Sequence, residues 1–470
     1  MDGPVSQCAC NAAAPGNKPT MNRHTPRLFF CLLALAATHA WGWGNHTIPS
    51  YRALEQMPEL AKAAPVPVES LESFLKAQEK TLEALLAIQE AWAVSNIDHY
   101  PKRPESLNFV ADPARTDAAR RQAFLMALRV APDAKFALFY QPDPAKVLPS
   151  GTALLTWSDV NTLPEPKHHH YRYVALKPGD AISPLEVVST ASDEPDYGLD
   201  LNCWSDSPSA WGKVYQFGKQ PFGNPAVANS TQAPFHMGFF HESRILYTAA
   251  PFIQRTFPLL RSYQYWSLAH LAFRTGHPYW GWRFAGLSLH YLQDLTQPYH
   301  ARLAPGNSTL KLLGVNFLAM AGLTGMKNDT IVLLSNRHLI VDRYQEEMNT
   351  VGAKDPKVDS LEKALADSSQ DARYPLWTDR YVRDVVAHQA AQSSEHLSDL
   401  LAQTLPTQYV NDPHFDFGAQ DDGVSLIGLL SKTDAKARET LDQAIADLLQ
   451  RFGSHTRNEI RNILNPAAQR

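Results

Sequence analysis

The chain has 470 residues, of which 44% are hydrophobic and 19% are charged, and its formal net charge is −4. This composition is typical of a globular protein with a sizeable core, and it excludes a disordered or fibrous chain. Without a surplus of basic residues, wholesale binding of duplex nucleic acid through its phosphates is not expected. The composition does not exclude a local basic groove.

Residues 21–40 have the organisation of an export signal. Two arginines precede an apolar run over 28–37, and small side chains follow at the positions that a signal peptidase reads. The run is too short to cross a bilayer of about 30 Å as a permanent helix. We expect cleavage after Ala40, a new N-terminus at Trp41, and export to the periplasm or out of the cell. Residues 1–20 look like an upstream start-site artefact.

Cysteine usage points to stabilisation without cross-links. The chain has four cysteines, and Cys203 alone lies beyond residue 40. A mature exported chain with one thiol forms no internal disulfide, so another device has to stabilise it in an oxidising compartment. Bound metal would serve.

Hydrophobic periodicity predicts a mainly α chain. Residues 50–96 repeat apolar positions at three- and four-residue steps, and helical patterns return later. Between them, proline-rich sequence with short apolar runs predicts a small mixed α/β lobe inserted at about 101–184. The later helical segments are 242–276, 279–295, 310–323, 355–404 and 420–464. We expect one helical domain over 41–470 that carries the inserted lobe and extra C-terminal helices at about 355–464.

The stretch LSLHYLQDLTQPYH, residues 287–300, has the spacing of a metal site. His290 and Asp294 are four residues apart, so on a helix of about 3.6 residues per turn they project from one face and can share a cation. Pro298 is expected to end this helix. His300 could then turn back toward the same cavity and bind a second ion.

Other segments offer further ligand groups: Trp41 with His46, Asp196, His236 with His241, and His338 with Asp342. Imidazole nitrogens, carboxylate oxygens and the amino and carbonyl groups of a freed N-terminus all bind zinc. Each also has a structural reading when taken alone. The acidic residues near Asp196 could form turns, the pair on the later helix could be an exposed face, and the aromatic segment 277–284 could pack in the core.

In their order along the chain these segments resemble the superfamily of zinc-dependent phospholipases C and fungal single-strand nucleases. The most specific element is LSLHYLQDLTQPYHA, residues 287–301. The resemblance implies an all-helical phospholipase C-like domain with three zinc ions in a cleft. It extends from Trp41 to Asp342 but fixes a minority of those positions.

By position, the resemblance implies three sets of ligands. The first zinc would be bound by Trp41, His46 and a bridging Asp294. The second would be bound by Asp196, His290, Asp294 and either His236 or His241, a choice left open by the unusually long spacing after Asp196. The third would be bound by His300, His338 and Asp342.

The chemistry that the resemblance implies is phosphodiester hydrolysis through a zinc-bridged hydroxide, with Asp196 accepting a proton or orienting the nucleophile. The sequence of the motif at 290–301 is closer to the phospholipase branch, which implies a phospholipase C that acts on headgroups at a membrane surface. Residues 277–282 are then a candidate surface for the acyl chains. Asp342 instead matches the nuclease branch, so a single-strand nuclease or nucleotidase is the first alternative. An exported, zinc-stabilised protein without catalysis is the second. No stable protein partner is predicted.

Overall fold

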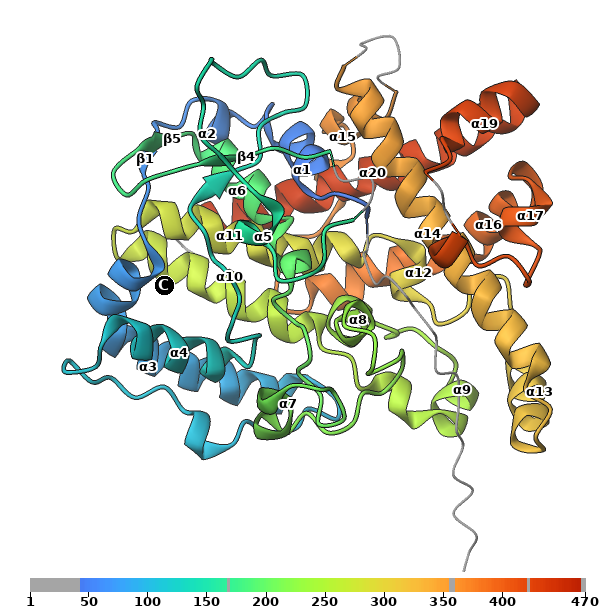
Figure 1. The fold of residues 1–470 in the computed structure, drawn as a ribbon, viewed down its shortest axis with the longest axis horizontal. Helices are drawn as coiled ribbons and strands as arrows, with labels where there is room; N and C mark the ends of the chain where they lie inside the picture. The colour runs from blue at the N-terminus through green and yellow to red at the C-terminus, as the bar shows by residue number, and fades with distance from the viewer. Residues whose placement is uncertain (1–42, 167–169, 355–359, 421–422, 466–470) are drawn as a thin grey trace, which may run out of the picture.

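The computed structural model describes residues 43–166, 170–354, 360–420 and 423–465, and over these residues the chain is mainly helical, which confirms the predicted class (Figure 1). The export signal and Trp41 lie outside the described residues. Among the described helices, none combines the length and the apolar character needed to cross a bilayer.

Two antiparallel helices form the centre of the molecule. Helices α10 (Pro258–Arg274) and α11 (Pro278–Asp294) pack along each other, and each begins with a proline, whose missing N–H costs nothing in a first turn. Every side chain of α11 from Tyr279 onward is buried. A helix buried on all sides needs cover on every face. α6 (Pro184–Ala191) and α20 (Ala435–Leu464) pack directly on α11, and α1 (Thr47–Leu54) packs on both of them.

The range 101–184 contains both helix and strand. Helix α4 (Asp117–Leu128) packs on the long α3 (Leu71–Asn96), and each is capped by the hydroxyl before it, from Thr116 and Ser70. A three-stranded antiparallel sheet has the order β2-β4-β3, and a second pairing joins β1 to β5. The strands are β1 (Val66–Pro67), β2 (Phe139–Tyr140), β3 (Leu154–Leu155), β4 (Tyr173–Ala175) and β5 (Ala181–Ile182).

The C-terminal helices are part of the main core. Helix α20 contacts α1, α11, α15 and α16. The longer helices of this half are α13 (Thr309–Met320), α14 (Gly325–Gly352) and α16 (His388–Thr404), and the seven-residue α15 (Ser360–Ala366) lies between the last two in sequence. The shorter helices are α2 (Pro58–Ala61), α5 (Trp157–Val160), α7 (Ala210–Tyr215), α8 (Ala233–His236), α17 (Thr407–Val410), α18 (Phe417–Gln420) and α19 (Leu426–Thr433), with single turns at Glu105–Leu107, Glu194–Tyr197, Asn229–Thr231 and Asp371–Arg373 and a π-helical segment at Val382–Ala387.

Prolines divide the chain more finely than the periodicity predicts. The pattern over 242–276 forms three pieces, α9 (Arg244–Ala249), a turn at Pro251–Gln254 and α10, because Pro251 and Pro258 cannot donate the hydrogen bonds that would join them. Pro298 does not end α11, which stops at Asp294; it begins the short helix α12 (Pro298–Ala301).

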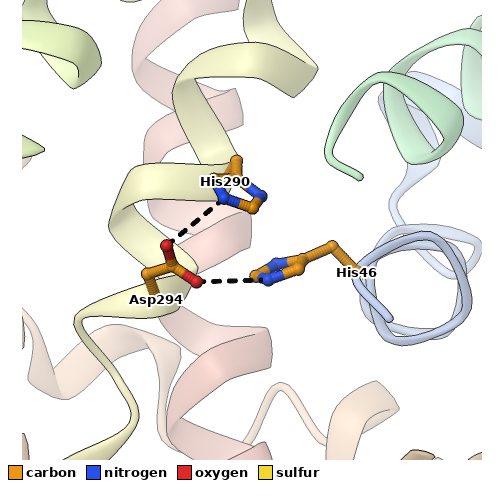
Figure 2. A group of neighbouring side chains, drawn as sticks. All are labelled: His46, His290 and Asp294. Carbon is orange, nitrogen blue, oxygen red and sulfur yellow. Dashed lines mark ion pairs between the residues drawn. The ribbon is translucent and has the colours of Figure 1, made fainter. Parts of the chain in front are cut away.

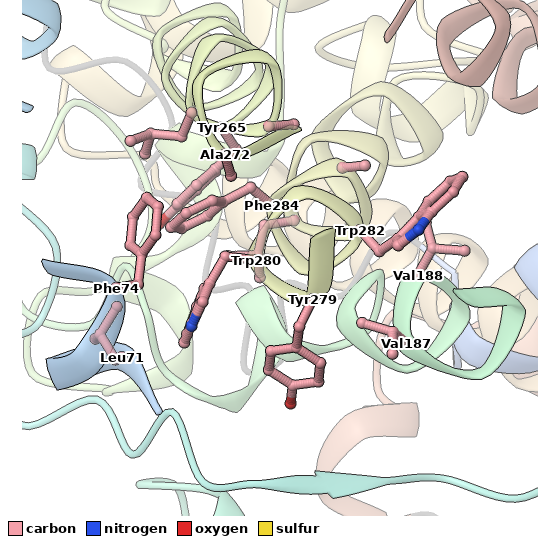
Figure 3. Packing of buried hydrophobic residues seen from close by; sticks show 14 of the residues in the cluster. Leu71, Phe74, Val187, Val188, Tyr265, Ala272, Tyr279, Trp280, Trp282 and Phe284 are labelled. Atoms are coloured by element: carbon pink, nitrogen blue, oxygen red, sulfur yellow. The ribbon is translucent and has the colours of Figure 1, made fainter. Parts of the chain in front are cut away.

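The aromatic segment 277–284 belongs to the core. Trp280 is fully buried and stacks on Phe74 at 5.9 Å between ring centroids, and Trp282 is 6% exposed (Figure 3). The expectation that this segment offers an acyl-chain surface is therefore wrong. Its rings are used to join α11 to α3 and α6.

Candidate metal centre

Asp294 lies at the meeting point of three histidines. His46, the residue before α1, places Nε2 3.2 Å from Oδ1 of Asp294. His290, one turn earlier on α11, places Nε2 3.2 Å from Oδ2 (Figure 2). His236, at the end of α8, places Nδ1 2.8 Å from the same Oδ2. One buried carboxylate thus uses both oxygens toward imidazoles from three segments.

Asp196 closes a second set of ligand atoms. It lies in a buried 3-10 turn, and its Oδ1 is 3.7 Å from both Nδ1 of His236 and Nε2 of His290. Among the described residues, two triplets have ligand atoms close enough to share an ion: His46, His290 and Asp294, and Asp196, His236 and His290.

A third group lies beside these two. Nε2 of His300, on α12, is 3.0 Å from Nε2 of His338, on α14, and that nitrogen is 3.3 Å from Oδ2 of Asp342 one turn later. Gln297 donates its side-chain amide to the other oxygen of Asp342. Eight of the ten predicted ligands are therefore seen to lie together.

The exceptions are Trp41 and His241. Trp41 lies outside the described residues. His241 points elsewhere: its Nε2 is 2.8 Å from the carbonyl oxygen of Arg383, and its ring contacts His388. The structure thus brings His236, and not His241, to the other candidate ligands.

The far side of three of the imidazoles faces an acceptor. Nδ1 of His46 faces the Gln293 side-chain oxygen at 2.9 Å, Nδ1 of His290 faces the Ser192 carbonyl at 2.8 Å, and Nδ1 of His300 faces the His236 carbonyl at 2.9 Å. A ring that donates there leaves its other nitrogen unprotonated toward the cluster, which is the form that binds metal.

His236 has a charged acceptor instead. Its Nε2 is 3.5 Å from Oδ2 of Asp200, which also accepts from the Tyr291 hydroxyl at 2.7 Å. The other oxygen of Asp200 accepts from Nε of Arg261 at 2.7 Å. All these side chains are buried. A carboxylate fixed in this way orients the imidazole and raises its basicity as a ligand.

Within the part of the chain that the structure describes, several buried atoms at the centre have no hydrogen-bond partner: Nε2 of His46, Oδ1 of Asp196, Oδ1 of Asp294 and Oδ2 of Asp342. Native proteins leave few such atoms without a reason. Nitrogen and carboxylate oxygen atoms at this spacing are the donors that zinc takes. The residues present therefore fit a metal centre.

The charges of the cluster also call for a cation. Burial, together with the nearby Asp294, raises the pKa of Asp196 well above its usual range, against the effect of His236. Burial likewise raises the pKa of Asp342. Burial opposes ionisation of Asp294 too, but His290, His236 and His46 lower its pKa well below the usual range. A divalent ion would replace the protons that these groups otherwise share.

Sequence reasoning missed the residues that support the ligands. Asp193 accepts from the backbone N–H of His46 at 2.8 Å and from the Tyr197 hydroxyl at 2.7 Å, and Asp200 supports His236. From the sequence alone, both residues could equally form turns. Their spacing could have identified them, because Asp193 stands three residues before the candidate ligand Asp196 and Asp200 stands four residues after it. Gln293 and Gln297, which flank Asp294 at one and three residues, are of the same kind.

Two recesses adjoin the centre. One, at Asp196 and Asp193, is lined mainly by residues of the range 101–184: Trp157, Asn161, Tyr171 and Tyr173. The other, at His338, is apolar and is lined by Phe222, Met237, Phe239, Tyr299, Leu303 and Leu334, among others. Residues of the range 101–184 therefore contribute directly to the surroundings of the candidate ligands.

Comparison with known proteins finds no match, whether among family models, curated proteins or solved structures. The geometry of the site is therefore what supports a functional proposal for this chain.

Proposed function

We propose that this chain is an exported zinc-dependent phosphodiesterase of the superfamily that its motifs resemble, with three zinc ions expected. The observation that carries the proposal is the convergence on Asp294 of His46, His236 and His290, from segments far apart in the sequence. Such a buried set of acceptors is costly without a cation. The third group, at His338, adds ligand atoms for a further ion.

Zinc bound at such a centre supplies activation of water and neutralisation of charge on a phosphoryl group. The chain's own residues would do the rest. Asp196 presents Oδ1, which has no hydrogen-bond partner among the described residues, toward the space between His236 and His290, where it can accept a proton from water or orient it. Asp200, Gln293 and Gln297 hold the ligands in position.

A phospholipid headgroup ester is the substrate that we favour, because the motif over residues 287–301 is closer to that of the phospholipases, and because apolar side chains line the small recess beside His338. The recess at Asp196 has no lysine or arginine among its lining residues, whereas a strand of nucleic acid needs cations along its path. One observation favours the nuclease alternative. Tyr171, which lines that recess and is partly exposed, is a ring of the type on which a base stacks.

The test of the metal centre compares two histidines that the sequence alone could not separate. We expect His236→Ala to lose zinc and the hydrolysis of bis(p-nitrophenyl) phosphate, because the ring touches Asp294 and faces Asp196. His241→Ala is the matched control and should retain both, since His241 contacts Arg383 instead. Equal effects of the two substitutions would contradict the proposal, and so would no effect of either.

The substrate is tested on the same protein. We expect phosphatidylcholine to be cleaved to diacylglycerol and the phosphorylated headgroup, with little release of nucleotides from single-stranded DNA. The opposite preference would establish the nuclease alternative. Tightly bound zinc without turnover of either substrate would establish the non-catalytic one.

A further inference from the structure

A charge-free apolar segment lies exposed at one edge of the molecule. Residues 312–326, which include most of α13, the loop after it and the start of α14, contain no charged side chain. Five large apolar side chains of this region are exposed: Leu310 (80%), Phe317 (70%), Leu323 (63%), Met326 (51%) and Met320 (39%). We call these five residues the apolar tip.

The apolar tip is a cluster and not a chance scatter. In the part of the chain that the structure describes, thirteen large hydrophobic residues are exposed, and five of them fall within these few turns. Single exposed apolar residues are ordinary, but a contiguous group marks a binding surface. A sixth residue, Ile245 (62%), lies on α9, which packs on α13.

Helix α13 is apolar on two sides. Leu312 and Val315 are buried, and α13 packs against α14 and α9. Leu310 and Phe317 point away from that contact and are exposed. Figure 1 shows α13 at the edge of the molecule, away from the central pair of helices. The exposed side is therefore available to a partner outside the chain.

Basic residues stand at both ends of the charge-free stretch. Lys311 precedes it and is exposed, and Lys327 follows it and is partly exposed. Apolar side chains flanked by lysines match a lipid surface, in which acyl chains lie below a layer of phosphates. At 12 residues, α13 is too short to cross a bilayer and would lie in the interface.

The apolar tip is also linked to the metal centre. Helix α14 carries Met326 at its start and His338 twelve residues later, which is about 18 Å along the helix axis. Leu334, between them, lines the apolar recess at His338. Apolar side chains thus lead from the exposed edge toward the candidate ligands.

We propose that the apolar tip docks this protein on a phospholipid surface, with Phe317 and Leu323 inserted among acyl chains and Lys311 and Lys327 at the phosphates. The proposal rests on the proposed function in one respect: a lipid substrate gives the docking its purpose. The docking itself is a binding event that can be measured without turnover.

The experiment is flotation of the protein with vesicles of phosphatidylcholine, with and without phosphatidylglycerol. We expect the double variant Phe317→Ser with Leu323→Ser to lower partitioning at least about tenfold, since burying each side chain contributes strongly to transfer from water. We expect Lys311→Glu with Lys327→Glu to lose binding only to vesicles that contain phosphatidylglycerol, by about fivefold or more for each lysine.

The matched control is Val147→Ser with Leu376→Ser, because these residues are 90% and 87% exposed in other segments. This control should float like the wild type. The melting temperature of every variant is compared with that of the wild type, so that a folding defect is recognised.

The outcomes separate the two proposals. Vesicle binding that the tip variants lose and the control keeps supports the docking surface, even if no phosphodiester is cleaved, in which case the proposed function falls alone. Wild-type protein that stays unbound, or a control that loses binding equally, overturns the docking surface. So does a wild-type dimer that the tip variants convert to monomers without any vesicle binding, because the tip would then join two copies of this chain.

Discussion

At the scale of single residues, the contact by which Asp200 orients His236 can be tested directly. Asp200 accepts from Arg261 and Tyr291 and faces Nε2 of His236, so Asp200→Asn keeps the shape but removes the charge that fixes the ring. We expect zinc affinity to fall about 10- to 100-fold in competition with a chelator. The substitution also leaves the Arg261 guanidinium buried without its partner, which costs about 3–5 kcal/mol of stability.

Tyr291→Phe is the control for Asp200→Asn. It removes one hydrogen bond to Asp200 and leaves the carboxylate in place, so zinc affinity should change little. If Asp200→Asn lowered stability but left zinc affinity at the wild-type value, Asp200 would be a purely structural residue.

A second residue gives the protein a dependence of stability on pH. Glu459, on α20, is buried and accepts from the Ser288 hydroxyl, and burial raises its pKa from 4.5 to about 7. The folded chain therefore keeps this proton up to about pH 7, whereas the unfolded chain releases it near pH 4.5. The folded state loses about 3 kcal/mol as pH rises across this window, and the loss is complete above it.

Glu459→Gln stays neutral at every pH, so it should remove this part of the pH dependence. Denaturant unfolding at pH 4.5 and pH 8 measures the effect. We expect the variant and the wild type to differ little at the lower pH and the variant to be more stable by up to about 3 kcal/mol at the higher one. A difference that is the same at both values would contradict this role.

At the scale of elements, the site depends on how closely α11 lies to α6. A Cβ atom at Gly286 would lie 2.4 Å from the Val188 carbonyl oxygen and 2.6 Å from the Ala191 Cβ. Gly286→Ala should therefore lower the free energy of unfolding by about 1–3 kcal/mol. It should also weaken zinc binding, because α6 leads to Ser192, whose carbonyl holds His290.

The control for Gly286→Ala is Gly314→Ala. Gly314 lies within α13, where an added Cβ meets nothing within 4 Å, so the substitution should raise stability by up to about 1 kcal/mol. Equal tolerance of both substitutions in a thermal melt would show that α6 and α11 can separate without cost.

How far the sequence predicts these elements depends on the kind of signal. The 3.6-residue periodicity predicts α3 and α11, and the four-residue spacing places His290 and Asp294 on one face. Local pattern does not show which side of a turn faces the core. For that reason His236 and His241 could not be separated, and Trp280 was a candidate for the surface although it is buried.

At the scale of the whole molecule, segments from the entire described chain meet at one centre. His46 comes from its beginning, and Phe452 and Thr456 of α20 come from its end: the Phe452 ring lies 6.4 Å from that of His46, and the Thr456 hydroxyl accepts from Gln293. Contacts of such long separation cannot be inferred from local pattern. Metal bound at this centre would therefore act as a cross-link for the fold, in a chain whose described part has one free cysteine.

Metal analysis of the purified mature chain, combined with chelation, tests the central claim most directly. We expect close to three zinc ions per chain, a melting temperature that falls on their removal, and hydrolysis of bis(p-nitrophenyl) phosphate that is lost with the zinc and restored by adding it back. A chain that binds no zinc, and whose melting temperature a chelator leaves unchanged, would contradict a metal centre at Asp294.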